Sequence, residues 1–154
     1  MVTLYVMVGL PGAGKTTWSR ANAERLGATV VGSDDVRREL IATGRDAANG
    51  DLVFAEVERR ARSQLRADRS VILDATHALR EYRTYTLRLA EEAAAWRVAV
   101  WIDVPVAVCL ERHAVRTNLV FDDVRAQAAL VLDLASRFEP PGPDEFDEVV
   151  RLGP

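Results

Sequence analysis

The sequence predicts an α/β fold in which a parallel sheet of about five strands is sandwiched by helices. Short apolar runs alternate with longer segments of helical periodicity along the chain. The runs lack the polar alternation of a half-exposed strand, so we expect both faces of the sheet to be covered. Strands that alternate with helices form parallel sheets with right-handed crossovers. We expect one domain over residues 1–154, because no linker divides the chain.

The strands are predicted from apolar and β-branched runs that are bounded by turn-forming residues. The first run follows Thr3 and stops at Gly9, and the third stops at Asp74. The predicted strands are Tyr5–Val8, Thr29–Val31, Val71–Leu73, Val98–Ile102 and a short one within Phe146–Leu152.

The helices are predicted from apolar spacing near 3.6 residues and from start and stop signals. Gly27 suits the end of the first helix, Ser33 can cap the second, and Pro105 suits the first turn of a later one. The predicted helices are Lys15–Leu26, Ser33–Leu40, Asp51–Ala67, Leu79–Trp96, Pro105 to about Arg116, and Asp122–Phe138.

Composition excludes several classes of protein. The net charge of −3 is unlike the strongly basic coat of many nucleic-acid-binding proteins, although a local basic groove is compatible with it. One cysteine and two histidines make neither an internal disulfide nor a metal cluster. No apolar run approaches the roughly 18–20 residues of a membrane span, and the start does not resemble a signal peptide. We therefore expect a soluble, cytoplasmic protein with no membrane partner.

A glycine-rich segment links the first predicted strand to the first predicted helix. Residues 9–16 read Gly-Leu-Pro-Gly-Ala-Gly-Lys-Thr, which fits the G-x-x-x-x-G-K-[ST] pattern of a P-loop. Its glycines let backbone N–H groups face phosphate oxygens, and the helix N-terminus adds partial positive charge. Lys15 is predicted to contact the terminal phosphates and Thr16 to bind Mg²⁺. The sequence therefore predicts a P-loop NTPase fold that binds a nucleoside triphosphate.

Lys15 is the only lysine in the chain, and the other 19 of its 20 basic residues are arginines. An ammonium is a compact point charge, whereas a guanidinium is a wide planar fork. A lone lysine at this position indicates that arginine does not serve there.

The residues after the strands indicate phosphoryl transfer rather than hydrolysis. A hydrolysing ATPase often has a glutamate beside its Mg²⁺ aspartate, but Ala75 follows Asp74 and Val104 follows Asp103. No Asn-Lys-x-Asp guanine motif is present either, which disfavours a regulatory GTPase and favours ATP. Transfer to an organic hydroxyl is therefore the leading hypothesis.

A charged segment follows the second predicted strand, at the edge of the sheet where the P-loop is expected. Asp34 there can act as general base for an attacking hydroxyl, or it can complement the charge of a helix N-terminus. Asp35 points about 100° away on a helix, so we expect it to have a different role. Arg37 can hold an anionic acceptor or lie on a solvated helix face.

A pair of arginines is expected to form a small helical lid. Arg112 and Arg116 are four residues apart and precede a predicted loop at Thr117–Val120. They can clamp the transferring phosphoryl group, or Arg112 can form a surface ion pair with Glu111. His77, just past the third strand, can contact substrate or be a buried, hydrogen-bonded polar residue.

Five arginines near the middle of the chain have two interpretations. They can form a basic stripe for a nucleic-acid backbone, but acidic residues are interleaved with them, which favours a solvated helix face. They are Arg59, Arg60, Arg62, Arg66 and Arg69.

Taken in order, these segments resemble the polynucleotide 5′-hydroxyl kinase branch of the P-loop kinases, a group related to zeta toxin and chloramphenicol phosphotransferase. The resemblance runs from about Tyr5 to Phe138. Two departures, His77 for a frequent asparagine and Val36 for a frequent aromatic residue, fall on the acceptor side. It rests on the segments at residues 9–18, 33–37, 71–76, 103–105 and 111–116.

The resemblance implies ATP and Mg²⁺ as cofactors and assigns roles to individual residues. The implied catalytic residues are Lys15, Asp34, Arg112 and Arg116. The implied nucleotide contacts are Gly12, Ala13, Gly14, Lys15, Thr16, Thr17 and Arg112. The implied acceptor contacts are Asp34, Arg37, Asp74, Thr76 and His77. The implied Mg²⁺ ligands are Thr16 and Asp74.

The sequence therefore favours an ATP-dependent kinase of the 5′-hydroxyl end of RNA or DNA. The same scaffold includes kinases of antibiotics, of aminoacylated tRNA and of nucleotide sugars, so a small-molecule kinase is the alternative. The acidic charge and the altered acceptor residues favour that alternative. A third hypothesis is an ATP-binding switch or accessory module without catalysis.

Overall fold

The structure is a computed structural model, in which residues 1–45, 50–115 and 124–153 are described. Its strands form one five-stranded sheet in the order β2-β3-β1-β4-β5, and every neighbouring pair is parallel. The predicted α/β class and parallel sheet are confirmed. The strands are β1 Thr3–Val8, β2 Ala28–Gly32, β3 Ser70–Asp74, β4 Trp96–Ile102 and β5 Glu148–Leu152.

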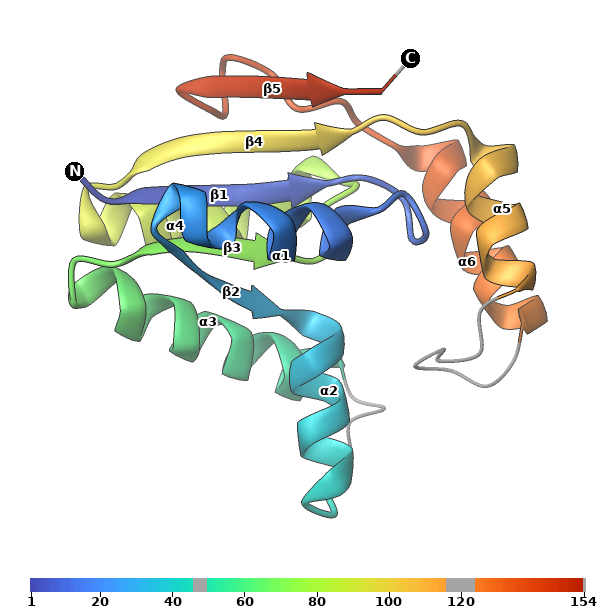
Figure 1. Cartoon of the computed structure of the whole chain (residues 1–154), viewed down its shortest axis with the longest axis horizontal. Helices are drawn as coiled ribbons and strands as arrows, with labels where there is room; N and C mark the ends of the chain where they lie inside the picture. The colour runs from blue at the N-terminus through green and yellow to red at the C-terminus, as the bar shows by residue number, and fades with distance from the viewer. Residues whose placement is uncertain (46–49, 116–123, 154) are drawn as a thin grey trace.

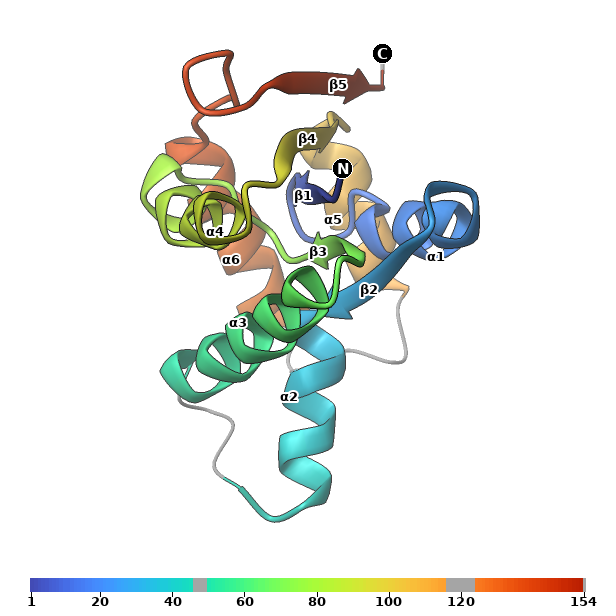
Figure 2. The same ribbon diagram turned by 90° about the vertical axis from the view of Figure 1, so that its left-hand side faces the viewer.

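Helices lie on both faces of the sheet (Figures 1 and 2). α1 packs on one face, α3 and α4 pack on the other, and α5 and α6 pack against each other near the carboxyl ends of the strands. The helices are α1 Lys15–Leu26, α2 Ser33–Ala42, α3 Gly50–Arg66, α4 Arg80–Ala93, α5 Val106–Ala114 and α6 Val124–Arg137.

The core has two layers, one on each face of the sheet. Alternate residues of β1 point to opposite faces, so Leu4 and Val6 join the cluster under α3 and α4, whereas Met7 joins the cluster under α1. On α3, Val57 and Leu65 belong to the buried stripe that the apolar spacing predicts. Each buried Val or Leu side chain of this kind contributes about 1.5–3 kcal/mol to folding.

The largest error in a predicted helix boundary among the described residues lies at the end of α4. The helix expected over Leu79–Trp96 ends at Ala93, and Trp96 is the first residue of β4. Ala94 turns the chain with φ +51°, and the backbone N–H of Ala95 donates to the carbonyl of Ala90 at 2.8 Å. The N–H of Trp96 then donates to the carbonyl oxygen of Val2. Pairing beside β1 thus takes the place of the helical hydrogen bonds that the alanine-rich sequence favours.

The predicted cap of the second helix is also wrong. Ser33 is the first residue of α2, Gly32 occupies the capping position, and no side-chain hydrogen bond caps this described end. The first turn instead carries Asp34 and Asp35, whose negative charges are favourable at a helix N-terminus.

The strand order places three loops at one edge of the sheet. β1 lies between β3 and β4. The two strands that follow β1 in the chain, β2 and β3, lie on one side of it, and the last two, β4 and β5, lie on the other side. Ligands of open parallel sheets bind at such a switch point, beyond the carboxyl ends of the strands. The segments after β1, β2 and β3 therefore form the candidate site.

Candidate active site

The glycine-rich loop between β1 and α1 is held at the carboxyl end of the sheet. Gly14 precedes α1 with φ +105°, a conformation that residues with a side chain rarely adopt. The backbone N–H of Gly9 donates to the carbonyl oxygen of Thr76 at 3.2 Å, which ties the start of the loop to the segment after β3. The loop thus has the strand-to-helix context that a phosphate-binding P-loop requires.

Lys15 lies inside this loop with only 7% of its surface exposed. Its Nζ donates to the carbonyl oxygens of Gly9 at 2.9 Å and Leu10 at 2.8 Å. These are neutral acceptors, whereas phosphate oxygens are charged and form stronger hydrogen bonds with an ammonium. When a phosphate is bound, the Lys15 ammonium can therefore donate to its oxygens instead of to the two loop carbonyls.

Thr16 and Asp74 meet where β1 and β3 end. The Thr16 hydroxyl donates to Oδ2 of Asp74 at 2.6 Å, and Asp74 is buried. Burial raises the pKa of Asp74 because it disfavours the charged carboxylate, while the Thr16 hydrogen bond and the Lys15 charge oppose that rise. Mg²⁺ prefers hard oxygen ligands and keeps several waters, so a hydroxyl, a carboxylate and phosphate oxygens suit it. The donor set therefore fits Mg²⁺ held by these two residues.

Asp35 faces the same space as Asp74. A β-carbon built on Gly32 would lie 3.2 Å from Oδ2 of Asp35 and 3.7 Å from Oδ2 of Asp74. Oδ1 of Asp35 also lies 3.5 Å from both Arg20 of α1 and Arg38 of α2. These exposed ion pairs contribute at most about 1 kcal/mol each, so they orient the carboxylate more than they stabilise the fold.

Asp34 is exposed in the first turn of α2, and its negative charge contributes to the raised pKa of Asp74. Arg37 is half-buried and lies one turn further along the same side of the helix. Thr76 is half-buried after β3, where its carbonyl already accepts from the loop. The structure thus brings these three predicted acceptor-side residues to the edge that carries the P-loop.

Arg112 reaches the P-loop from α5. Its Nη1 donates to the carbonyl oxygens of Gly12 at 3.0 Å and Ala13 at 3.1 Å. Arg116, its predicted partner, and the predicted loop after it lie outside the described residues. Thr17, another predicted nucleotide contact, is exposed in the first turn of α1.

His77, predicted as an acceptor contact, is instead buried between β1 and α4. Its Nδ1 lies 2.9 Å from the carbonyl oxygen of Met7, so this nitrogen donates. Its Nε2 lies 3.1 Å from the Thr86 hydroxyl and accepts from it. Both ring nitrogens are used inside the fold, as the alternative interpretation of this histidine expected.

The buried position of His77 predicts a pH-dependent stability. Burial lowers its pKa from 6.5 to about 4, so the ring stays neutral in the folded state between these pH values while the unfolded chain binds a proton. Stability is therefore expected to fall as pH drops from about 6.5 to about 4, by roughly 3 kcal/mol in total. Urea unfolding measured from pH 7.5 to 4.5 checks this, and His77→Gln should flatten the profile. An unchanged slope in that variant would contradict the assignment.

Arg83 supports the segment that carries His77, and no sequence pattern pointed to it. The side chain is fully buried, and its Nε and Nη2 each donate to the Glu145 carboxylate at 2.9 Å. Its Nη1 donates to the carbonyl oxygens of His77 at 3.0 Å and Glu139 at 2.8 Å. One arginine thus fixes the turn after β3 against the segment that leads to β5.

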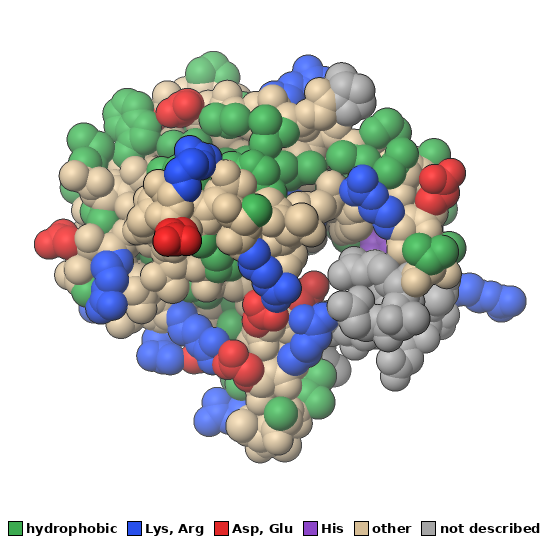
Figure 3. All heavy atoms as spheres, in the orientation of Figure 1, with side chains coloured by type: hydrophobic (Ala, Val, Ile, Leu, Met, Phe, Trp, Pro, Cys, Tyr) green, Lys and Arg blue, Asp and Glu red, His purple; other side chains and the backbone are tan. Residues whose placement is uncertain are grey.

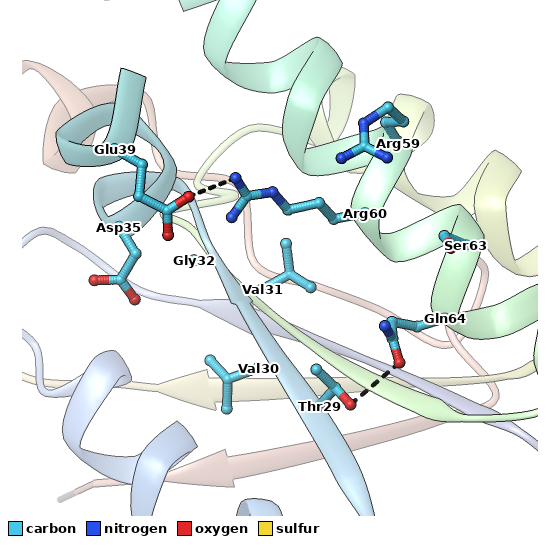
Figure 4. Close-up of a pocket in the computed structure, with 10 residues that line it drawn as sticks. All are labelled: Thr29, Val30, Val31, Gly32, Asp35, Glu39, Arg59, Arg60, Ser63 and Gln64. Atoms are coloured by element: carbon cyan, nitrogen blue, oxygen red, sulfur yellow. Dashed lines mark hydrogen bonds and ion pairs between the residues drawn. The ribbon is translucent and has the colours of Figure 1, made fainter. Parts of the chain in front are cut away.

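A groove of about 360 Å³ runs along the outer edge of β2, between α2 and α3 (Figure 4). Both arginines that line it are paired with carboxylates, since Arg60 donates to Glu39 at 2.5 Å and Arg59 donates to Glu56 at 2.7 Å. Figure 3 likewise shows acidic side chains interspersed with the arginines on the visible face. The arginines of α3 described here therefore support a solvated, ion-paired helix face.

Asp103, which follows β4, does not join the candidate site. Its Oδ2 accepts from Arg151 of β5 at 2.9 Å, and the Arg151 guanidinium lies 4.6 Å from the centroid of the Trp101 ring. The position of Asp103 after a strand end resembles that of Asp74, but the Asp103 carboxylate binds the last strand to the sheet.

Among the described residues, no helix is both long and apolar enough to cross a membrane.

Relatives of this chain include proteins of very different length. An uncharacterized protein of Mycobacterium tuberculosis (strain H37Rv) is 33% identical over 164 residues, which cover 94% of this chain and 33% of that protein. The chain thus spans about one third of the length of the mycobacterial relatives it matches. A shikimate kinase of Corynebacterium glutamicum is 33% identical over 121 residues, which cover 74% of this chain and 66% of the enzyme.

Solved structures share the fold at lower sequence identity. A protein of Chloroflexus aurantiacus superposes with a TM-score of 0.77 at 19% identity, over 98% of this chain and 87% of that one. A gluconokinase of Sinorhizobium meliloti superposes with a TM-score of 0.63 at 20% identity, over 97% and 81%. The chain therefore shares its fold with these two proteins. A family model described as an AAA domain matches residues 4–141, and the chain belongs to that AAA domain family.

Proposed function

We propose that this domain is an ATP-dependent kinase that transfers the γ-phosphoryl group to a hydroxyl of a small molecule. The observation that carries this proposal is the convergence of three groups at one sheet edge. These are the buried Lys15 ammonium in the P-loop, the hydrogen-bonded Thr16–Asp74 pair, and the exposed Asp34 carboxylate at the start of α2. Donor and acceptor chemistry can meet there.

The roles of the residues follow from the charges that change during transfer. The acceptor oxygen forms a bond to the γ-phosphorus while the bond to the β–γ bridging oxygen breaks, so ADP leaves with the charge of that oxygen. Asp34 takes the proton of the acceptor hydroxyl. Lys15 and Arg112 balance negative charge on the transferring group and the departing phosphate. Thr16 and Asp74 would hold Mg²⁺, which would supply positive charge against the charge of the phosphates.

Three observations support a small acceptor over a polynucleotide. The described arginines that line the β2 groove form ion pairs with carboxylates of the protein. A nucleic-acid backbone is bound instead by basic side chains that neutralise its phosphates. The net charge is negative. One relative at 33% identity is a shikimate kinase and a structural neighbour is a gluconokinase, both named for small acceptors.

Transfer from ATP labelled at the γ-phosphate tests the proposal. The acceptors offered should include gluconate, shikimate, neutral sugars and a 5′-hydroxyl oligonucleotide. We expect a labelled small molecule, with a Michaelis constant for the acceptor that depends weakly on salt. Nucleotide binding without transfer to any hydroxyl would support a non-catalytic module and refute the kinase.

A polynucleotide 5′-hydroxyl kinase is the second candidate, because the Asp34–Arg37 element and the Arg112–Arg116 spacing resemble that branch. It predicts label on the oligonucleotide alone. It also predicts that binding of the oligonucleotide weakens steeply as salt rises, since each phosphate contact releases a counterion.

Replacing Lys15 by alanine is expected to lower kcat for phosphoryl transfer by about 10²–10³-fold, because a preorganised charge facing the phosphates is lost. Lys15→Arg should fail to restore the rate, since a planar guanidinium does not fit the space where one ammonium bonds two loop carbonyls. Initial rates with labelled ATP measure both variants. Full activity in Lys15→Ala would contradict the assigned role.

A further inference from the structure

The last turn of α5 rests against the P-loop at Gly12. This glycine has φ +84°, and a β-carbon built on it would lie 3.1 Å from Nε2 and 3.2 Å from Cδ2 of His113. The same β-carbon would lie 3.1 Å from the backbone oxygen of Cys109. The imidazole of His113 therefore occupies the space that a side chain at Gly12 would need.

His113 is almost fully buried, with 2% of its surface exposed, although it follows an exposed arginine. That arginine, Arg112, donates to the carbonyl oxygens of Gly12 and Ala13. Two successive residues of α5 thus hold the same stretch of loop, one by hydrogen bonds to its carbonyls and one by packing of a ring against Gly12.

The contact belongs to a packed unit that joins the loop to two helices. Ala13 of the P-loop shares an apolar cluster with Cys109 of α5 and with Val131 and Leu134 of α6. Packed elements of this kind shift together rather than bend independently. A displacement of α5 is therefore transmitted to the peptide groups of the P-loop.

We propose that His113 is a positioning residue for the nucleotide, acting through Gly12. The imidazole holds the Gly12–Ala13 peptide in the curled conformation in which the N–H groups of the loop face phosphate oxygens. It also keeps the guanidinium of Arg112 within hydrogen-bonding distance of the carbonyl oxygens of Gly12 and Ala13. The inference rests on the proposed nucleotide site and adds to it a residue that touches neither ATP nor the acceptor.

A double-mutant cycle tests the contact directly. The variants are Gly12→Ala, His113→Ala and the two combined, with the dissociation constant of ATP measured by calorimetry and phosphoryl transfer measured with labelled ATP. We expect His113→Ala to raise the KM for ATP about tenfold and to change kcat less than twofold. Gly12→Ala should weaken ATP binding more, because a new methyl group meets both the ring and the Cys109 backbone oxygen, and because alanine is strained at a φ of +84°. Removing the ring should relieve that clash, so the combined variant should bind ATP better than Gly12→Ala alone.

Two further variants separate positioning from a general loss of stability. Val57→Ala removes a buried side chain of α3 from the separate cluster under α3 and α4, and should lower the melting temperature without changing the KM for ATP. His113→Phe keeps a flat ring beside Gly12 and should retain ATP affinity within about threefold.

The outcomes distinguish this inference from the proposed function. Independent, multiplicative effects of Gly12→Ala and His113→Ala on the dissociation constant would overturn the positioning role, as would a Val57→Ala variant that raises the KM equally. A His113→Phe variant that loses ATP binding would overturn it too. Absence of ATP binding by the unmodified protein would instead refute the nucleotide site itself.

Discussion

Replacing Asp34 by alanine is expected to lower kcat for phosphoryl transfer by about 10²–10⁴-fold, the usual contribution of a positioned general base. The dissociation constant of ATP should stay within about twofold, because Asp34 lies on α2 and the described contacts of the P-loop come from β1, α1, α5 and the segment after β3. Single-turnover transfer of labelled phosphate and calorimetric titration with ATP measure the two quantities separately.

Asp51 provides the matched control for this substitution. It lies in the first turn of α3, as Asp34 lies in the first turn of α2, and both are exposed. If Asp34 served only to complement the helix N-terminus, Asp34→Ala and Asp51→Ala would each cost about 0.3–1 kcal/mol of stability and leave transfer intact. We expect that stability loss in both variants and the loss of transfer in Asp34→Ala alone. Equal transfer rates in the two variants would refute the general-base role.

The local features of the protein could be predicted because each is encoded by neighbouring residues. Gly9, Gly14 and Lys15 make the P-loop recognisable within eight positions, and the loop lies between a strand and a helix as expected. The apolar runs likewise predicted β1, β3 and β4, since a buried strand leaves a continuous apolar signature, and shorter β-branched segments predicted β2 and β5. Asp34 and Asp74 were placed at one edge because parallel strands end on the same side.

The features that escaped prediction depend on tertiary contacts. Trp96 begins a strand although alanine-rich sequence precedes it, because its N–H pairs with Val2 far away in the chain. The sequence left His77 open between a substrate contact and a buried polar residue, and a position on a helix gives His113 no signal of burial, yet neighbouring elements enclose both of them. A single histidine carries no periodic signal, so only the packing around it decides its environment. The strand order, which sets the switch point, is likewise absent from local sequence.

Arg83 illustrates the same limit and gives the largest expected effect on stability. It lies on α4 among residues whose spacing predicts an ordinary amphipathic helix, and its partner Glu145 is 62 residues away beyond a proline-rich turn. Burying an ion pair is favourable only when hydrogen bonds satisfy the remaining donors and acceptors. Arg83 meets that condition, because its Nη1 donates to the carbonyl oxygens of His77 and Glu139.

Replacing Arg83 by methionine is expected to lower the free energy of unfolding by about 3–5 kcal/mol, because Glu145 is left as a buried charge with Arg80 only at 3.8 Å. The melting temperature should fall by about 6–20 °C for a domain of this size. Adding Glu145→Met should recover part of the loss, since it removes the uncompensated charge. The exposed pair of Arg62 and Glu92 is the control, and Arg62→Met should cost less than about 1 kcal/mol.

Urea unfolding of the four proteins at pH 7 and constant ionic strength measures these differences. An Arg83→Met variant as stable as Arg62→Met would show that the buried pair contributes no more than a surface one. A double variant less stable than Arg83→Met would show that Glu145 is satisfied without its arginine. The expected order of stabilities follows from one physical difference. Replacing both members of a buried ion pair costs less stability than replacing one, because replacing one leaves a buried charge without its partner. The turn after β3, which brings Thr76 to the P-loop, depends on this buried pair, because Arg83 also donates to the carbonyl oxygen of His77 in that turn.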